Sequence, residues 1–67
     1  MGNRQKLIYE YIKGYLAEHS YSPTIREIAY GVGLNSPATV HGHLESMRRK
    51  GYIDFIDQRS RTLHILR

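Results

Sequence analysis

Two helix starts separated by a glycine turn occupy the middle of this chain. Residues 24–27 (TIRE) have the capping-box pattern, in which a threonine and a glutamate satisfy free N–H groups at a helix N-terminus. Residues 31–33 (GVG) then end the helix, because glycine adopts the left-handed conformation of a helix C-terminus at little cost. Ser36 is the expected N-cap of the next helix, with Pro37 as its first residue. Two helices joined by a short glycine-bearing turn are typical of a helix-turn-helix.

An amphipathic segment precedes this pair. The spacing predicts a helix over residues 4–18, with Asn3 as its N-cap and His19 and Ser20 at its end. Its apolar side chains recur at alternating intervals of three and one residues, and the stripe consists of Leu7, Ile8, Tyr11, Ile12, Tyr15 and Leu16. The third helix repeats the pattern with Val40, Leu44 and Met47 on its buried side.

The C-terminal segment alternates as β-strands do. Residues 52–56 (YIDFI) and 62–66 (TLHIL) each place apolar side chains at every second position, and residues 57–61 (DQRSR) form a polar tip between them. An isolated two-stranded hairpin is marginal in water, so the helices must cover its apolar face. The sequence therefore predicts an α+β fold: a three-helix winged helix-turn-helix with a C-terminal two-stranded β-hairpin wing, forming one domain over residues 1–67.

Composition narrows the class of partner. The chain has 67 residues, and its 10 lysines and arginines exceed its 6 acidic residues, for a net charge of +4. This charge favours an anionic partner, with nucleic acid ahead of a membrane surface, although it also suits ordinary solubility. No apolar run approaches the roughly 20 residues that span a bilayer. We therefore expect no membrane association and a cytoplasmic location.

The sequence gives little support for a metal site or for a catalytic site. The chain has no cysteine, which excludes disulfides and thiolate zinc sites. His41 and His43 resemble a metal pair, but side chains two positions apart on a helix diverge by about 200°. No strained serine turn of the hydrolase type is readable. We predict no metal, no cofactor and no enzymatic activity.

The outward face of the third helix is small and uncharged in its N-terminal half, and charge appears only toward its C-terminal end, which includes residues 48–50 (RRK). This distribution suits a helix inserted N-terminus first into the DNA major groove. Thr39 can contact a thymine methyl group or a base edge, and His41 can reach from the flank. Gly42 has three readings: room for DNA, a tolerated glycine, or close packing against another helix.

Four arginines are candidates for the DNA backbone. Arg49 is placed to meet phosphate or, alternatively, only to match the helix dipole. Arg59 and Arg61 at the hairpin tip are placed to clamp phosphate or enter the minor groove, or simply to keep an exposed turn soluble. Arg26 lies beside the positive end of a helix dipole, where a cation is unfavourable, so phosphate contact is the more attractive reading there.

Four stretches and one serine keep the order and spacing of a known DNA-binding domain: residues 21–28 (YSPTIREI), 32–34 (VGL), 39–44 (TVHGHL) and 50–53 (KGYI), with Ser36. They resemble the N-terminal domain of the LexA family, the repressors of the bacterial SOS response. The run TVHGHL is similar to the Gram-positive type. In the family this domain is followed by a self-cleaving Ser-Lys domain; the sequence leaves open whether the present chain is cut from such a repressor or stands alone.

The resemblance implies sequence-specific binding of double-stranded DNA at an inverted-repeat operator with GAAC/GTTC-type half-sites, filled by two copies. It implies base contacts from Ser36, Ala38, Thr39, His41 and Gly42. It implies backbone contacts from Thr24, Arg26, Arg59 and Arg61. The alternative hypotheses are a winged helix that binds protein, for which apolar residues on the third helix are expected, and an accessory module that acts on a repressor.

Overall fold

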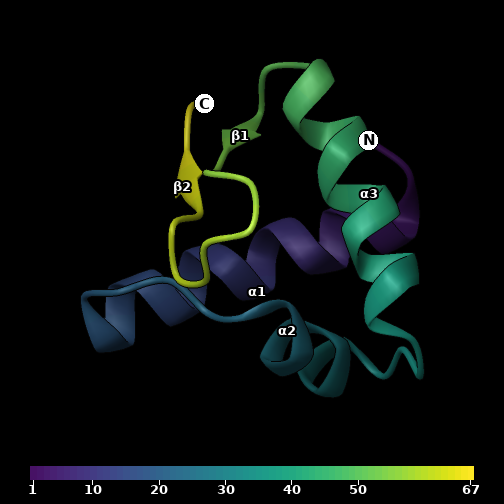
Figure 1. Cartoon of the computed structure of the whole chain (residues 1–67), viewed down its shortest axis with the longest axis horizontal. Helices are drawn as coiled ribbons and strands as arrows, with labels where there is room; N and C mark the ends of the chain where they lie inside the picture. Colours follow the sequence, from purple (N-terminus) through teal and green to yellow (C-terminus); the bar gives the residue numbers. More distant parts are fainter.

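The computed structural model describes residues 1–67, which form three helices followed by a short hairpin (Figure 1). The helices are α1 (Asn3–His19), α2 (Ile25–Val32) and α3 (Pro37–Arg49), and the strands are β1 (Ile53–Asp54) and β2 (His64–Ile65). The strands pair antiparallel, with Ile53 opposite Ile65. In Figure 1, the hairpin and α3 both stand above α1, the hairpin on the left and α3 on the right, and α2 lies below. The predicted α+β winged helix-turn-helix is confirmed.

Capping explains where α2 and α3 begin. The Thr24 hydroxyl accepts a hydrogen bond from the Glu27 N–H at 3.1 Å, and the Glu27 carboxylate accepts from the Thr24 N–H at 2.8 Å. The Ser36 hydroxyl accepts from the Thr39 N–H at 3.4 Å, with Pro37 as the first helical residue. Both predicted caps are confirmed, and Gly33 takes the left-handed conformation (φ 75°) that ends α2.

The start of α1 differs from the prediction. Gly2 is the N-cap and Asn3 is already helical, with no side-chain cap bond. The helix therefore starts without the capping energy that an asparagine would have supplied, and it depends on packing of its buried face. At its other end, Ser20 takes a left-handed conformation (φ 64°) and its N–H donates to the Leu16 carbonyl.

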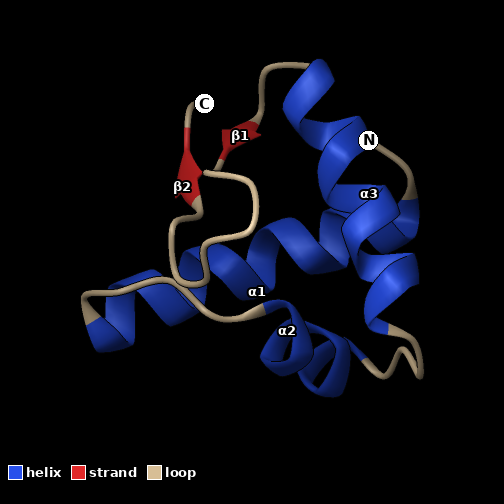
Figure 2. Ribbon diagram, viewed as in Figure 1, coloured by secondary structure: helices blue, strands red, loops and turns tan.

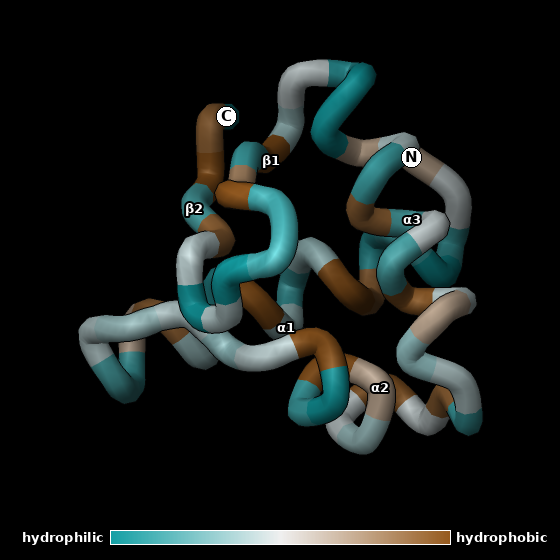
Figure 3. The backbone as a smooth tube through the Cα atoms, viewed as in Figure 1, coloured by the Kyte–Doolittle hydropathy of each residue, from teal (hydrophilic) through white to brown (hydrophobic).

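The core draws on every helix and on the hairpin. Nine apolar residues are buried together: Ile8, Ile12, Ile28, Ala29, Val40, Leu44, Met47, Ile53 and Leu63. The predicted stripe of α1 is only partly right, because Leu7 is 58% exposed and Tyr11 and Tyr15 are half-buried. Figure 3 shows the loop between the strands as a mostly hydrophilic stretch.

The strands are shorter than predicted, with two residues each and a long connecting loop (Figure 2). Side chains take the backbone groups that a longer ladder would have used. The Asp54 carboxylate accepts from the Phe55 N–H at 2.8 Å, and Arg48 donates to the Phe55 carbonyl at 3.1 Å. The Thr62 hydroxyl accepts from the Ile56 N–H at 2.9 Å. The loop is thus held by side chains instead of by strand pairing.

No helix of this chain has both the length and the apolar character to cross a membrane. No group of three or more His, Asp or Glu side chains is arranged to hold a metal ion.

Candidate nucleic-acid interface

The α3 helix turns its predicted base-reading residues outward. Val40, Leu44 and Met47 are buried against the core and fix the rotation of the helix. The opposite side is exposed at Ala38, Thr39, His41, Gly42 and Arg49, and Ser36 at the N-cap is half-buried. The five residues predicted to contact bases therefore share one end of one helix.

Gly42 lies on this open side. A Cβ atom built at Gly42 would meet no heavy atom within 4 Å. The reading that Gly42 allows close packing against another helix of this chain is therefore wrong. Room for DNA and simple tolerance remain as explanations of a glycine that costs about 1 kcal/mol in mid-helix.

His41 lies where α3 faces the wing. Its Nε2 atom is 3.7 Å from a carboxylate oxygen of Glu45, and its ring meets the Phe55 ring edge-on with the centroids 6.2 Å apart. About half of the His41 side chain is exposed. The imidazole is thus oriented by its neighbours and still open to a ligand.

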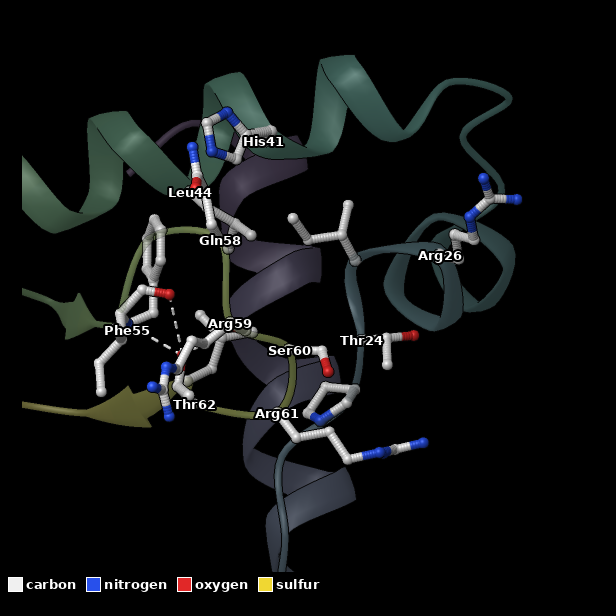
Figure 4. Close-up of a pocket in the computed structure, with 14 residues that line it drawn as sticks. Thr24, Arg26, His41, Leu44, Phe55, Gln58, Arg59, Ser60, Arg61 and Thr62 are labelled. Atoms are coloured by element: carbon white, nitrogen blue, oxygen red, sulfur yellow. Dashed lines mark hydrogen bonds between the residues drawn. The ribbon is translucent and has the colours of Figure 1, made fainter.

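A groove of about 410 Å³ separates α3 from the wing and from the start of α2. Buried side chains, among them Leu44 and Leu63, contribute to its floor. Figure 4 shows Gln58 extending from the wing loop toward α3, whereas Arg26 points away from the groove. The groove is therefore a concave surface bounded by α3, the wing and the N-terminus of α2.

Of the four arginines predicted to contact the DNA backbone, three have guanidinium groups that are exposed and unpaired. Arg26, Arg49 and Arg59 are exposed, and none of them forms an ion pair within the chain. Thr24 is half-buried, and its hydroxyl oxygen accepts the capping hydrogen bond from the Glu27 N–H. Its O–H is still a hydrogen-bond donor at the start of α2. Thr24, Arg26 and Arg59 belong to the lining of the groove, whereas Arg49 lies at the C-terminal end of α3, outside that lining.

Arg61 is different, because its guanidinium folds back onto the chain. Nη1 donates to the Ser22 carbonyl at 3.0 Å and to the Tyr15 hydroxyl at 3.3 Å, and Nη2 donates to a Glu27 carboxylate oxygen at 3.2 Å. The group also lies over the Tyr21 ring, 4.9 Å from its centroid. The Tyr15 and Glu27 bonds raise the pKa of Arg61, so the cation persists at any physiological pH. Arg61 is therefore not the free cation that its place at the hairpin tip predicts.

Sequence reasoning missed Arg48 as a link between α3 and the wing. Its guanidinium donates to Glu45 at 2.7 Å and to Asp57 at 3.1 Å, and it stacks 4.1 Å from the Phe55 ring centroid. The hydrogen bond that Arg48 donates to Glu45 is the main cause of the raised pKa of Arg48. The i,i+3 spacing of Glu45 and Arg48 on a helix indicates their ion pair, but no sequence pattern indicates the contact between Arg48 and Asp57.

Comparison with known proteins decides the family. The family model described as the LexA DNA binding domain matches residues 1–62. This chain belongs to that family. The LexA repressor of Carboxydothermus hydrogenoformans is 46% identical over 66 residues, which is 98% of this chain and 32% of the relative. The LexA repressor of Clostridium novyi is 45% identical over 65 residues, 97% of this chain and 32% of the relative.

Membership in the LexA DNA binding domain family confirms the resemblance drawn from the sequence. The chain spans about a third of the length of the curated relatives that it matches. The helix-turn-helix of the family is α2 and α3, and the hairpin is its wing.

Proposed function

We propose that this chain is the operator-reading domain of a LexA-like repressor of the SOS type. In this proposal, α3 enters the major groove of an inverted-repeat operator, N-terminus first. The observation that carries the proposal is the exposed N-terminal end of α3, small and uncharged, in a domain that also exposes three arginines with no ion-pair partner, Arg26, Arg49 and Arg59. Such an end admits close approach to base edges, while the arginines meet phosphates.

The base contacts come from Ser36, Ala38, Thr39, His41 and Gly42. Thr39 supplies a methyl group and a hydroxyl to a base edge, and His41 supplies a ring nitrogen from the groove flank. Ala38 and Gly42 allow the helix to lie close. The Ala38 N–H at the start of α3 has no partner within the chain, and it favours a nearby phosphate.

The backbone contacts come from Thr24, Arg26, Arg49 and Arg59. They lie at the start of α2, at the C-terminal end of α3 and on the wing, so phosphate contacts come from each element that flanks the base-reading end of the domain. Two copies occupy adjacent half-sites of GAAC/GTTC type, and the setting is a bacterial, phage or plasmid regulator in the cytoplasm.

Fluorescence anisotropy of the 67-residue chain tests this function. The probe is a labelled duplex with a GAAC–GTTC inverted repeat, and the competitors are the unlabelled repeat, a single half-site and a shuffled duplex, each at two salt concentrations. The proposal predicts that the repeat competes best and the shuffled duplex at least about tenfold worse. It also predicts that all affinities fall with salt.

Two results would count against the proposal in different ways. Equal, salt-steep binding to every duplex would mean that the domain binds DNA without reading this operator. No binding to any duplex at low salt would favour a winged helix whose α3 face binds protein or acts on another repressor.

A further inference from the structure

The tip of the wing is not fixed by its own strands. Strand pairing covers only Ile53 with Ile65 and Asp54 with His64. Gln58 and Arg61 in the connecting loop have left-handed backbones, with φ of 61° and 58°. Such backbones cost of order 1 kcal/mol or more in residues other than glycine and persist where the surroundings impose them. Thr62 bonds Ile56 and Arg59 within the loop, and further side-chain bonds join the loop to the helices and to the segment before α2.

Arg61 supplies one attachment. Its three hydrogen bonds reach α1, the segment before α2, and α2 itself. Next to it, the Leu63 N–H donates to the Ser22 hydroxyl at 3.1 Å, and Ser22 is only 3% exposed. The wing segment of residues 61–63 is thus held against Ser22 by two hydrogen bonds. The Arg61 guanidinium donates one, and the Leu63 N–H donates the other.

Glu27 is shared between this attachment and the cap of α2. One carboxylate oxygen accepts from the Thr24 N–H at 2.8 Å, and the other accepts from Arg61 at 3.2 Å. A carboxylate has acceptor sites for both bonds, whereas an amide has only one oxygen. The same side chain therefore ties the wing to the N-terminus of α2.

Arg48 supplies the other attachment. Its guanidinium donates hydrogen bonds to the Phe55 carbonyl and to the Asp57 carboxylate, both in the wing segment that follows β1. It also donates to the Glu45 carboxylate on α3, the helix that carries Arg48. Arg48 consequently fixes residues 55–57 of the wing to α3, and Arg61 fixes residues 61–63 of the wing to α2.

We propose that Arg61 and Arg48 are positioning residues that hold the wing, and that Glu27 joins the wing to the start of α2 so that both meet DNA as one body. This inference rests on the proposed DNA-binding function and deepens it. The competing role for Arg61 is direct contact with phosphate.

Charge distinguishes the two roles. If Arg61 neutralised a phosphate, its loss would reduce the slope of log affinity against log salt by about 0.9. A positioning residue changes affinity with little change in that slope. Glu27→Gln distinguishes the two roles more clearly, because they predict opposite changes in affinity. Removing a negative charge near DNA favours binding electrostatically, whereas loss of the ion pair between Glu27 and Arg61 disfavours it. Glutamine also fits a capping box, so α2 keeps its cap.

The experiment compares the wild-type chain with Arg61→Asn, Glu27→Gln and the Glu27→Gln/Arg61→Asn double variant. Asparagine tolerates the left-handed backbone at this position, so it removes the guanidinium without adding strain. Arg59→Ala is the matched control, since Arg59 lies on the same loop and forms no ion pair. Operator affinity is measured at four or more salt concentrations.

We expect Arg61→Asn and Glu27→Gln each to weaken operator binding roughly tenfold at unchanged salt slope, and the double variant to lose no more than either single change. Arg59→Ala should instead lower the slope. A reduced slope in Arg61→Asn, together with tighter binding by Glu27→Gln, would overturn the inference and make Arg61 a phosphate contact.

Amide hydrogen exchange on the free chain separates this inference from the DNA proposal. The Leu63 amide should exchange at least about tenfold faster in Arg61→Asn and Glu27→Gln, and at the wild-type rate in Arg59→Ala. If no duplex binds but this pattern holds, the DNA function fails and the attachment of the wing stands. Wild-type exchange in all variants would refute the attachment, whatever the DNA result.

Discussion

Gly31 packs directly against the ring of Tyr11. A Cβ atom at Gly31 would lie 2.1 Å from Cε2 of that ring, so α1 and α2 approach as closely as they do only because position 31 has no side chain. The contact sets the angle at which α2, and with it the helix-turn-helix, leaves α1.

Gly31→Ala should therefore destabilise the fold by about 1–3 kcal/mol, because the added methyl group must displace an aromatic ring. Urea unfolding of the variant measures the change. Gly14→Ala is the control: a Cβ at Gly14 meets nothing within 4 Å, and that substitution should stabilise α1 by up to about 1 kcal/mol. Equal stability of the two variants would show that Tyr11 moves aside freely.

Gly42→Ala should separate stability from function. The position is open, so alanine should raise the free energy of unfolding by up to about 1 kcal/mol, as in Gly14→Ala. The methyl group should at the same time weaken operator binding, because it occupies space next to the bases. Unfolding and anisotropy on the same samples decide the matter. Unchanged binding by Gly42→Ala would make the glycine a merely tolerated residue.

Acid should weaken the cap of α2 through Glu27. The hydrogen bond from the Thr24 N–H is the main cause that lowers the pKa of Glu27, and the bond from Arg61 adds to it. The folded-state pKa lies below the unfolded value of about 4.3, so the stabilisation is full above that pH and is lost as pH falls through the folded pKa. Urea unfolding between pH 6 and pH 3 should show wild type converging on Glu27→Gln at the acid end. A constant difference across that range would contradict this.

Arg26 and Arg49 should contribute to affinity without contributing to sequence preference. Arg26→Ala and Arg49→Ala should each weaken the operator and the shuffled duplex alike and reduce the salt slope by about 0.9. Lys13→Ala, an exposed cation of α1 whose ammonium lies 5.3 Å from the Tyr9 ring centroid, removes the same charge outside the proposed interface. If Lys13→Ala lowered the slope as much, the effect would be one of net charge.

Local rules explain what the sequence could predict. The caps at Thr24 and Ser36 and the left-handed Gly33 and Gly51 follow from spacing over a few residues. The buried side of α3 follows from helical periodicity, and the family resemblance follows from runs of matching residues. The residues predicted to read bases fall on one exposed helix end for the same reason.

Contacts between distant segments could not be predicted in this way. Arg61 meets Glu27 across 34 positions and Tyr15 across 46. Leu7 fits the apolar stripe of α1, yet no neighbouring element covers it, so it stays exposed. The strands end early because Arg48 and Thr62 take backbone groups that alternation alone assigns to a ladder.

Reading of base sequence by α3 is the central claim, and binding to a panel of operator duplexes tests it most directly. The panel consists of the GAAC–GTTC repeat and versions with one base pair changed at a time, titrated with wild type, His41→Ala and Lys13→Ala. Wild type and Lys13→Ala should lose roughly 5- to 150-fold at each changed pair of the half-site. His41→Ala should lose discrimination at one or two adjacent pairs and keep it elsewhere. Uniform weakening of every duplex by His41→Ala, or no discrimination by wild type, would contradict the account.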